Sequence, residues 1–479
     1  MFMLAPNSLR ALPLSFSLAA LLQLSVGCNG ATLGRGGDEG DGQGDGGTED
    51  GGSVRPPVPP KIPGCVGACV VNSKCSPAMG PTTLTGVVTI PSGNLPLYNA
   101  KVYIPTGDAL PPPPQSGPSC DLCDTAPALF STSTDINGRF TLTNVPSGQN
   151  IPLIIRVGKW RRVVTIPSVT DCTSTPLDPA MTRLPRNQSE GNIPRIALST
   201  GNADALECIL RNKKLGLDDS EFTPETGTGR VNLYAGANGA NKYAPTLNGG
   251  AAFTAAKVTP AASWWDSSAN WSKYDIVMLS CEGSPLMEYK SAAALANLEK
   301  YIGDGGRVFA SHWHNGWIAN AKSPQKIQTV ATFPNVGDLG SITETIDTSF
   351  TKGSALADWL ILPEVWGPGQ PPMRGQLPVV GAKNTIGTIA MKLTQRWVYA
   401  SASTPQYFSF NAPIGATADK QCGQMVFTDL HVSSGTGGDA SSDAVPFPNG
   451  CKANTLSAQE KALIFMLFDL TNCLQPPIG

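Results

Sequence analysis

Three histidines and one glutamate are the side chains whose types and positions could do chemistry together. His312, His314 and His431 are the three histidines of the 479-residue chain, and each follows a predicted strand, as does Glu282. Because ligands of open α/β sheets bind at the carboxyl ends of the strands, these side chains are expected to meet at one edge. His312 and His314 are two residues apart, so extended backbone would project both imidazoles to one side. We therefore predict a metal or ligand site at His312, His314, His431 and Glu282.

Two chemistries suit these residues. Neutral imidazoles and carboxylates, including that of Asp429, could hold a divalent metal such as zinc with a bound hydroxide. The same groups could act without a metal as an acid–base pair. The histidines could equally be structural residues that form hydrogen bonds in tight turns, beside Trp313 and Trp317. No complete catalytic triad accompanies them, so the sequence leaves open whether the protein is an enzyme and whether its cofactor is a divalent metal.

The elements that must position this site read as an α/β domain over residues 193–479. A continuous apolar strand at 274–280 precedes a helix at 289–302 and another strand. Strand, helix and strand at this length predict a right-handed crossover in a largely parallel, flavodoxin-like sheet. A capping box at Ser457–Glu460 opens a last helix that is apolar almost all round and is expected to be buried. The predicted strands cover 195–199, 274–280, 306–310, 396–399, 406–410 and 424–428.

Residues 65–192 read as a cysteine-rich segment with a small antiparallel β-sandwich. Alternating patterns predict strands at 84–90, 100–104 and 139–143, and Phe140 and Leu142 point to one side of the last strand. The fold class is therefore multidomain, with a β-sandwich followed by the α/β domain.

Twelve cysteines indicate an oxidising compartment. Six of them fall between residues 65 and 172, where disulfides are favoured over zinc or a catalytic thiol, and fifteen pairings of the six are possible. If Cys28 is lipidated, eleven remain, so at least one cysteine is free or pairs with another molecule, and we expect it to be Cys281. The six are Cys65, Cys69, Cys75, Cys120, Cys123 and Cys172.

The first 64 residues read as an export signal and a tether. Arg10 precedes an apolar stretch at 11–26 that is short for a membrane span, which predicts a signal peptide over 1–27. The run Leu24–Cys28 resembles a bacterial lipobox, so Cys28 is the expected lipidation site and the bilayer an expected partner; secretion with Cys28 unmodified is the alternative. Residues 28–64 are rich in Gly, Asp and Pro and predict a disordered tether. The protein is thus expected to be exported and lipid-anchored to the cell envelope, at the outer membrane or cell surface.

Two segments resemble known families. The turn and strand at Asp135–Thr143, with Val145–Gly148 after them, resemble the carboxypeptidase regulatory-like module, a transthyretin-like β-sandwich that carries no catalytic residues. Residues 274–283, 298–314 and 423–431 resemble the class I glutamine amidotransferase-like fold, closest to its trehalose-utilisation (ThuA-like) branch.

The second resemblance implies a large insertion at about 316–395. It also implies an elbow after the strand that ends at Ala310, where amidotransferases carry a nucleophilic cysteine. This chain has no cysteine there, so glutaminase chemistry is not implied. The whole layout resembles bacterial surface lipoproteins with an appended regulatory-like module.

Charge and architecture together narrow the function. The chain has 34 Lys and Arg against 36 Asp and Glu, a net charge of -2, which excludes nucleic-acid binding through a basic surface. We expect a membrane-tethered extracytoplasmic lipoprotein that binds a glycan, a cell-wall fragment or a protein partner through its α/β domain. The alternative is a surface hydrolase, with or without a metal, that acts at His312, His314 and His431.

Overall fold

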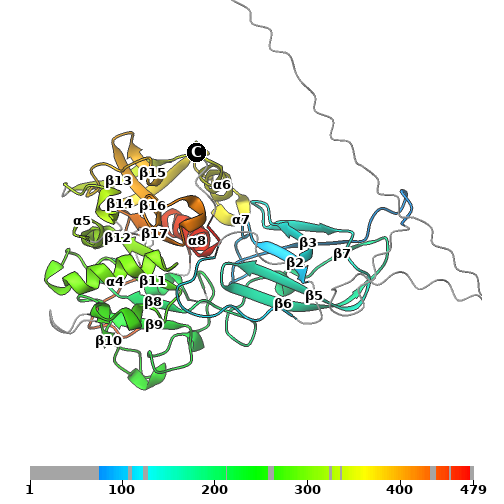
Figure 1. Cartoon of the computed structure of the whole chain (residues 1–479), viewed down its shortest axis with the longest axis horizontal. Helices are drawn as coiled ribbons and strands as arrows, with labels where there is room; N and C mark the ends of the chain where they lie inside the picture. The colour runs from blue at the N-terminus through cyan, green and yellow to red at the C-terminus, as the bar shows by residue number, and fades with distance from the viewer. Residues whose placement is uncertain are drawn as a thin grey trace, which may run out of the picture. The chain divides into compact units, whose positions relative to one another are not determined.

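Figure 1 shows the computed structural model of the chain. The predicted signal peptide, Cys28, the tether, Cys65, Cys69 and Cys123 lie outside the residues that it describes. The structure describes residues 75–474, apart from 106–109, 122–127, 212, 257–263, 323–325, 335–336, 432–437 and 453–454. The described residues belong to one compact unit.

Two small sheets lie in the N-terminal part of the described chain. The first, in the order β4-β1-β7, contains β1 (Thr83–Val87), β4 (Arg139–Thr143) and β7 (Ser174–Pro176). The second, in the order β3-β2-β5-β6, contains β2 (Lys101–Pro105), β3 (Ala128–Ser133), β5 (Gly148–Val157) and β6 (Trp160–Val169). Burial alternates along β4, where Phe140 and Leu142 are buried, as the period of two predicts. All of these strand pairings are antiparallel except β1 with β7, which is parallel.

A ten-stranded sheet forms the rest of the framework, in the order β10-β9-β8-β11-β12-β17-β16-β15-β13-β14. Neighbours from β10 to β17 are parallel, and neighbours from β17 to β14 are antiparallel. The parallel strands are β8 (Ile196–Ser199), β9 (Val231–Ala235), β10 (Thr254–Ala255), β11 (Ile276–Leu279), β12 (Arg307–Ser311) and β17 (Gly423–Thr428). The others are β13 (Asp338–Ile346), β14 (Gln376–Lys383), β15 (Gln395–Ser401) and β16 (Thr404–Ala412).

The sheet is therefore mixed, where the sequence predicts a largely parallel one. The predicted insertion at about 316–395 supplies β13 and β14, which join the sheet at its far edge. Antiparallel neighbours such as β15 and β16 need only a short turn, whereas each added parallel strand needs a crossover. The chain thus extends the sheet with hairpin-like pairings.

Two longer helices cover opposite faces of the sheet (Figure 1). Helix α4 (Ala292–Gly303) begins at the N-cap Ser291 and connects the parallel strands β11 and β12, which confirms the predicted crossover. Helix α8 (Ala458–Thr471) begins with the predicted capping box of Ser457 and Glu460 and is buried along nearly its whole length. The shorter helices are α1 (Pro179–Thr182), α2 (Leu206–Ile209), α3 (Ser268–Trp271), α5 (Gly316–Ala319), α6 (Thr351–Leu360) and α7 (Pro363–Trp366).

Successive residues of the parallel strands pack into two different cores. Met278 and Phe309 belong to a core that includes α8 and the apolar residues of both small sheets. Val277 and Val308 belong to a second core with the apolar face of α4. Because the first core is continuous, the small sheets and the ten-stranded sheet share buried apolar surface, which is the main source of folding stability.

The disulfides connect parts of the chain that are far apart in sequence. Cys75 pairs with Cys172, Cys120 with Cys422, and Cys208 with Cys451. The expectation that the six cysteines of 65–172 pair among themselves is wrong for Cys120, whose partner directly precedes β17. Sequence spacing does not reveal this pairing, because a disulfide depends on the distance and orientation of the two cysteines in the folded chain, with Cα atoms about 4.4–6.8 Å apart.

Within the described part of the chain, no helix is both long enough and apolar enough to cross a membrane.

Candidate metal centre

Three side chains meet where the neighbouring strands β11, β12 and β17 end. Leu279 pairs with Ala310 in register, so two residues further on Cys281 lies beside His312. Ser311 pairs with Thr428, and His431 follows that strand by three residues. The sequence predicts that histidines gather at this edge, and the structure brings two of the three, His312 and His431, together there.

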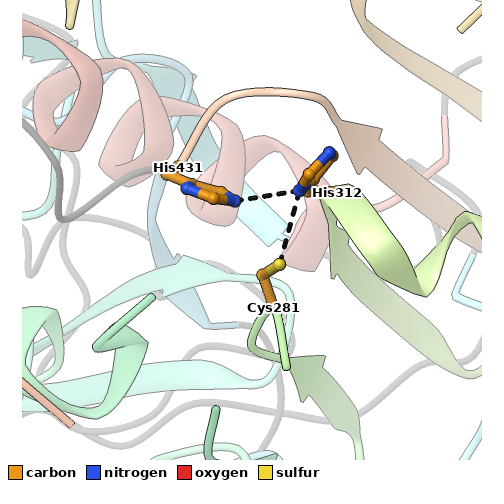
Figure 2. Close-up of side chains that lie close together, drawn as sticks. All are labelled: Cys281, His312 and His431. Carbon is orange, nitrogen blue, oxygen red and sulfur yellow. Dashed lines mark hydrogen bonds between the residues drawn. The ribbon is translucent and has the colours of Figure 1, made fainter. Parts of the chain in front are cut away.

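The ligand atoms of this Cys–His–His cluster are close enough to share one ion (Figure 2). Cys281 Sγ lies 3.5 Å from His312 Nδ1, and His431 Nε2 lies 3.0 Å from the same nitrogen. All three atoms lie within 4.8 Å of one another. A tetrahedral ion with bonds of about 2.1 Å to nitrogen and about 2.3 Å to sulfur holds its ligand atoms about 3.3–3.6 Å apart. The separations of 3.5 and 3.0 Å are close to these values, whereas the outer limit of 4.8 Å exceeds them, so the three groups must move slightly closer together to share one ion.

Burial sets the protonation of the three groups. Cys281 and His312 are buried and His431 is half-buried. Burial raises the pKa of the Cys281 thiol to about 12 and lowers the pKa of His312 to about 3, and it lowers the pKa of His431 as well. Without a metal the thiol is protonated and both imidazoles are neutral. A nucleophilic cysteine needs a lowered pKa, so Cys281 with its raised pKa is poorly suited to covalent catalysis. Neutral imidazole, in contrast, is the form of histidine that binds a metal ion.

His312 itself adopts an unusual backbone conformation. Its φ of 44° lies in the left-handed region, and it directly follows β12 and opens the 3-10 helix η5 (His312–Asn315). A residue other than glycine rarely adopts this conformation, and such sites often coincide with function. Its Nε2 is buried and has no hydrogen-bond partner among the described residues. The turn thus presents Nδ1 to Cys281 and His431.

His314 does not join the cluster, contrary to the prediction. Its Nδ1 accepts a hydrogen bond from Trp317 Nε1 at 3.0 Å, and its Nε2 donates to the carbonyl oxygen of Ser280 at 2.8 Å. Both ring nitrogens are therefore occupied, and burial lowers the pKa of this histidine to about 4. The prediction assumed extended backbone, but the 3-10 helix turns by about 120° per residue, so residues two apart face different directions.

The carboxylates expected near the histidines have other partners. Glu282 accepts a hydrogen bond from the Ala237 backbone at 2.8 Å and lies 3.4 Å from Lys290 Nζ. Asp429 accepts hydrogen bonds from the backbone amides of Thr385 and Ile386. Neither carboxylate belongs to the cluster. Each instead accepts hydrogen bonds from the backbone of a neighbouring loop.

Cys281 takes the place that the sequence analysis gave to His314 and Glu282. Among the described residues Cys281 is the free cysteine, which confirms the prediction that it is the unpaired one. It is not among the candidate metal ligands that the sequence predicts. The sequence does contain a pattern that indicates this role, since Cys281 follows the buried strand β11 just as the histidines follow their strands.

Comparisons with known proteins give only remote similarity. No protein-family model and no curated protein sequence matches the chain. A crystal structure of a thua-like protein from Bacteroides uniformis has 10% sequence identity and a TM-score of 0.26, over 42% of this chain and 72% of the other. A cytoplasmic protein from Salmonella typhimurium has 11% identity and a TM-score of 0.30, over 58% of this chain and 99% of the other.

Proposed function

We propose that this protein binds a transition metal ion through Cys281, His312 and His431. The observation that carries the proposal is the convergence of one thiol and two imidazoles within 4.8 Å of one another. Sulfur and imidazole ligands favour Zn²⁺ or a copper ion over Mg²⁺ and Ca²⁺, which prefer oxygen. Burial favours neutral imidazoles before binding, and the thiol gives up its proton when the metal binds.

The proposal predicts that the purified chain binds one Zn²⁺ or Co²⁺ ion per molecule. After treatment with a chelator, titration with Co²⁺ is expected to give a thiolate-to-cobalt absorption band together with the visible bands of a tetrahedral complex. Zn²⁺ is then expected to displace the cobalt at equal stoichiometry. Absence of a saturable complex, or a complex without the thiolate band, would contradict the proposal.

The wider role that we propose is binding of a glycan, a cell-wall fragment or a protein partner at this edge of the sheet. The metal would then be part of the recognition site. A surface hydrolase is the second candidate, because three protein ligands and a half-buried His431 leave a coordination position for water, as in catalytic zinc sites. Chelator-sensitive turnover of an ester or glycoside by the metal-loaded protein would favour the hydrolase, and binding without turnover the first role.

We also propose the architecture that accompanies this function. Taken in chain order, the parallel strands other than the edge strand β10 lie in the sheet order 2-1-3-4-5, the order of flavodoxin-like domains, which supports a flavodoxin-like, ThuA-like α/β domain. The two small sheets contribute apolar residues to one core, which supports a β-sandwich of the carboxypeptidase regulatory-like kind.

The anchoring at Cys28 is proposed from the sequence, and the disulfides are compatible with an exported protein. Replacing Cys28 with serine is expected to move the protein from the membrane fraction to the soluble fraction, because the acyl chains are lost with the thiol. Fractionation after a high-salt wash measures this. A Cys28→Ser protein that stays with the membranes would disprove lipid anchoring through this residue.

A further inference from the structure

A buried carboxylate, that of Asp204, contacts the residue that precedes His312 of the Cys–His–His cluster. It belongs to the loop that follows β8, the neighbour of β11 in the sheet, and it is 1% exposed. Ser311 Oγ donates a hydrogen bond to Asp204 Oδ2 at 2.9 Å. The amide of Ala203, the preceding residue, donates to the carbonyl oxygen of Cys281 at 3.1 Å. The loop therefore contacts Cys281 and the residue next to His312.

The charge of Asp204 also acts on the third member of the cluster. Burial lowers the pKa of His431, and the negative charge of Asp204 opposes that effect, as expected for a carboxylate near the ring. Two other carboxylates that act on the cluster have lysine partners. Glu282 pairs with Lys290, and Asp338 pairs with Lys383 at 2.7 Å. Each of these pairs contributes little net charge to the site.

We propose that Asp204 is a positioning residue that holds the metal ligands in place and balances the charge of the bound ion. This inference rests on the proposed metal site. A divalent ion with one thiolate and two neutral imidazoles leaves a net charge of +1, which is costly in a buried position without a compensating charge. The Asp204 carboxylate supplies that charge, and its hydrogen bond with the Ser311 side chain holds the residue that precedes His312.

Asp204→Asn tests the charge, because asparagine keeps nearly the same volume and can still accept the hydrogen bond from Ser311. Loss of a group that supports metal ligands typically lowers affinity by about 10- to 100-fold. We expect a loss of that order in Zn²⁺ affinity, together with a shift of the Co²⁺ absorption bands. Ser311→Ala, which keeps the charge and removes the hydrogen bond, is expected to give a smaller loss and the same direction of shift.

Asp275→Asn is the matched control, since Asp275 is also a buried carboxylate but lies at the other end of β11. It accepts hydrogen bonds from Gly117, Lys159 and Arg195. This variant is expected to lower the thermal midpoint of the protein and to leave Zn²⁺ affinity and the Co²⁺ spectrum unchanged.

The outcomes separate this inference from the function on which it rests. If the unaltered protein binds Co²⁺ with a thiolate band and Asp204→Asn binds it with the same affinity and spectrum, the role of Asp204 is wrong and the metal site stands. If the unaltered protein binds neither Co²⁺ nor Zn²⁺, both proposals fail. If Asp275→Asn weakens metal binding as much as Asp204→Asn does, the effect is one of general stability and the role of Asp204 is also wrong.

Discussion

Replacing Cys281 with serine is expected to lower Zn²⁺ affinity by at least about 100-fold, since loss of a mere supporting group already costs about 10- to 100-fold. The thiolate is a direct ligand of the proposed ion, and a serine hydroxyl does not ionise to replace it. The thiolate-to-cobalt band is expected to disappear, which absorption titration measures. Serine is close to cysteine in size, so the metal-free protein is expected to unfold at nearly the same temperature.

His314→Ala is the control, because His314 lies two residues from His312 but uses both ring nitrogens inside the protein. Its removal leaves the Trp317 indole N–H and the Ser280 carbonyl without their partners, which costs about 1–3 kcal/mol for each buried group left unsatisfied. Stability should fall and metal stoichiometry should not change. A His314→Ala protein that loses the metal, beside a Cys281→Ser protein that keeps it, would show that the ligands are wrongly assigned.

Removal of the Cys120–Cys422 disulfide is expected to cause the largest loss of stability. The bond joins residues 302 apart in sequence, and long closed loops gain the most from the entropy that a cross-link removes from the unfolded chain. The double variant Cys120→Ser and Cys422→Ser is therefore expected to lose about 2–5 kcal/mol of unfolding free energy.

Denaturant unfolding under non-reducing conditions measures this loss. Changing both cysteines leaves no new thiol that could exchange with the remaining disulfides. The control removes Cys75 and Cys172 in the same way, because their bond spans 97 residues and closes a shorter loop. If the Cys120 and Cys422 variant unfolds at the same denaturant concentration as the unaltered protein, the disulfide does not contribute to stability.

The sequence predicts well those features that depend on short stretches of chain. Apolar runs reveal β11 and β12 and the crossover helix between them, and the capping box reveals the start of α8. The position of His312 and His431 after strands was enough to place both at one edge, because parallel strands share a direction.

Features that depend on distant contacts or on single dihedral angles were missed. The pairing of β13 with β14 and β15 joins segments that no local pattern connects. The left-handed φ of His312 turns the following residues into a 3-10 helix and sends His314 away from the site. The spacing predicts a partner for Cys120 among the cysteines of 65–172 without choosing one, and only the folded chain shows that its partner is Cys422.

The Cys120–Cys422 disulfide also determines what happens when a protease cuts the chain. A single cut anywhere between residues 120 and 422 leaves Cys120 in one fragment and Cys422 in the other, so the two fragments stay covalently joined. Cys281 and His312 lie inside that interval and His431 lies beyond it, so a nick between His312 and Cys422 separates the candidate ligands in sequence but not in space. The nicked protein keeps its ligands on one covalent molecule until the disulfides are reduced.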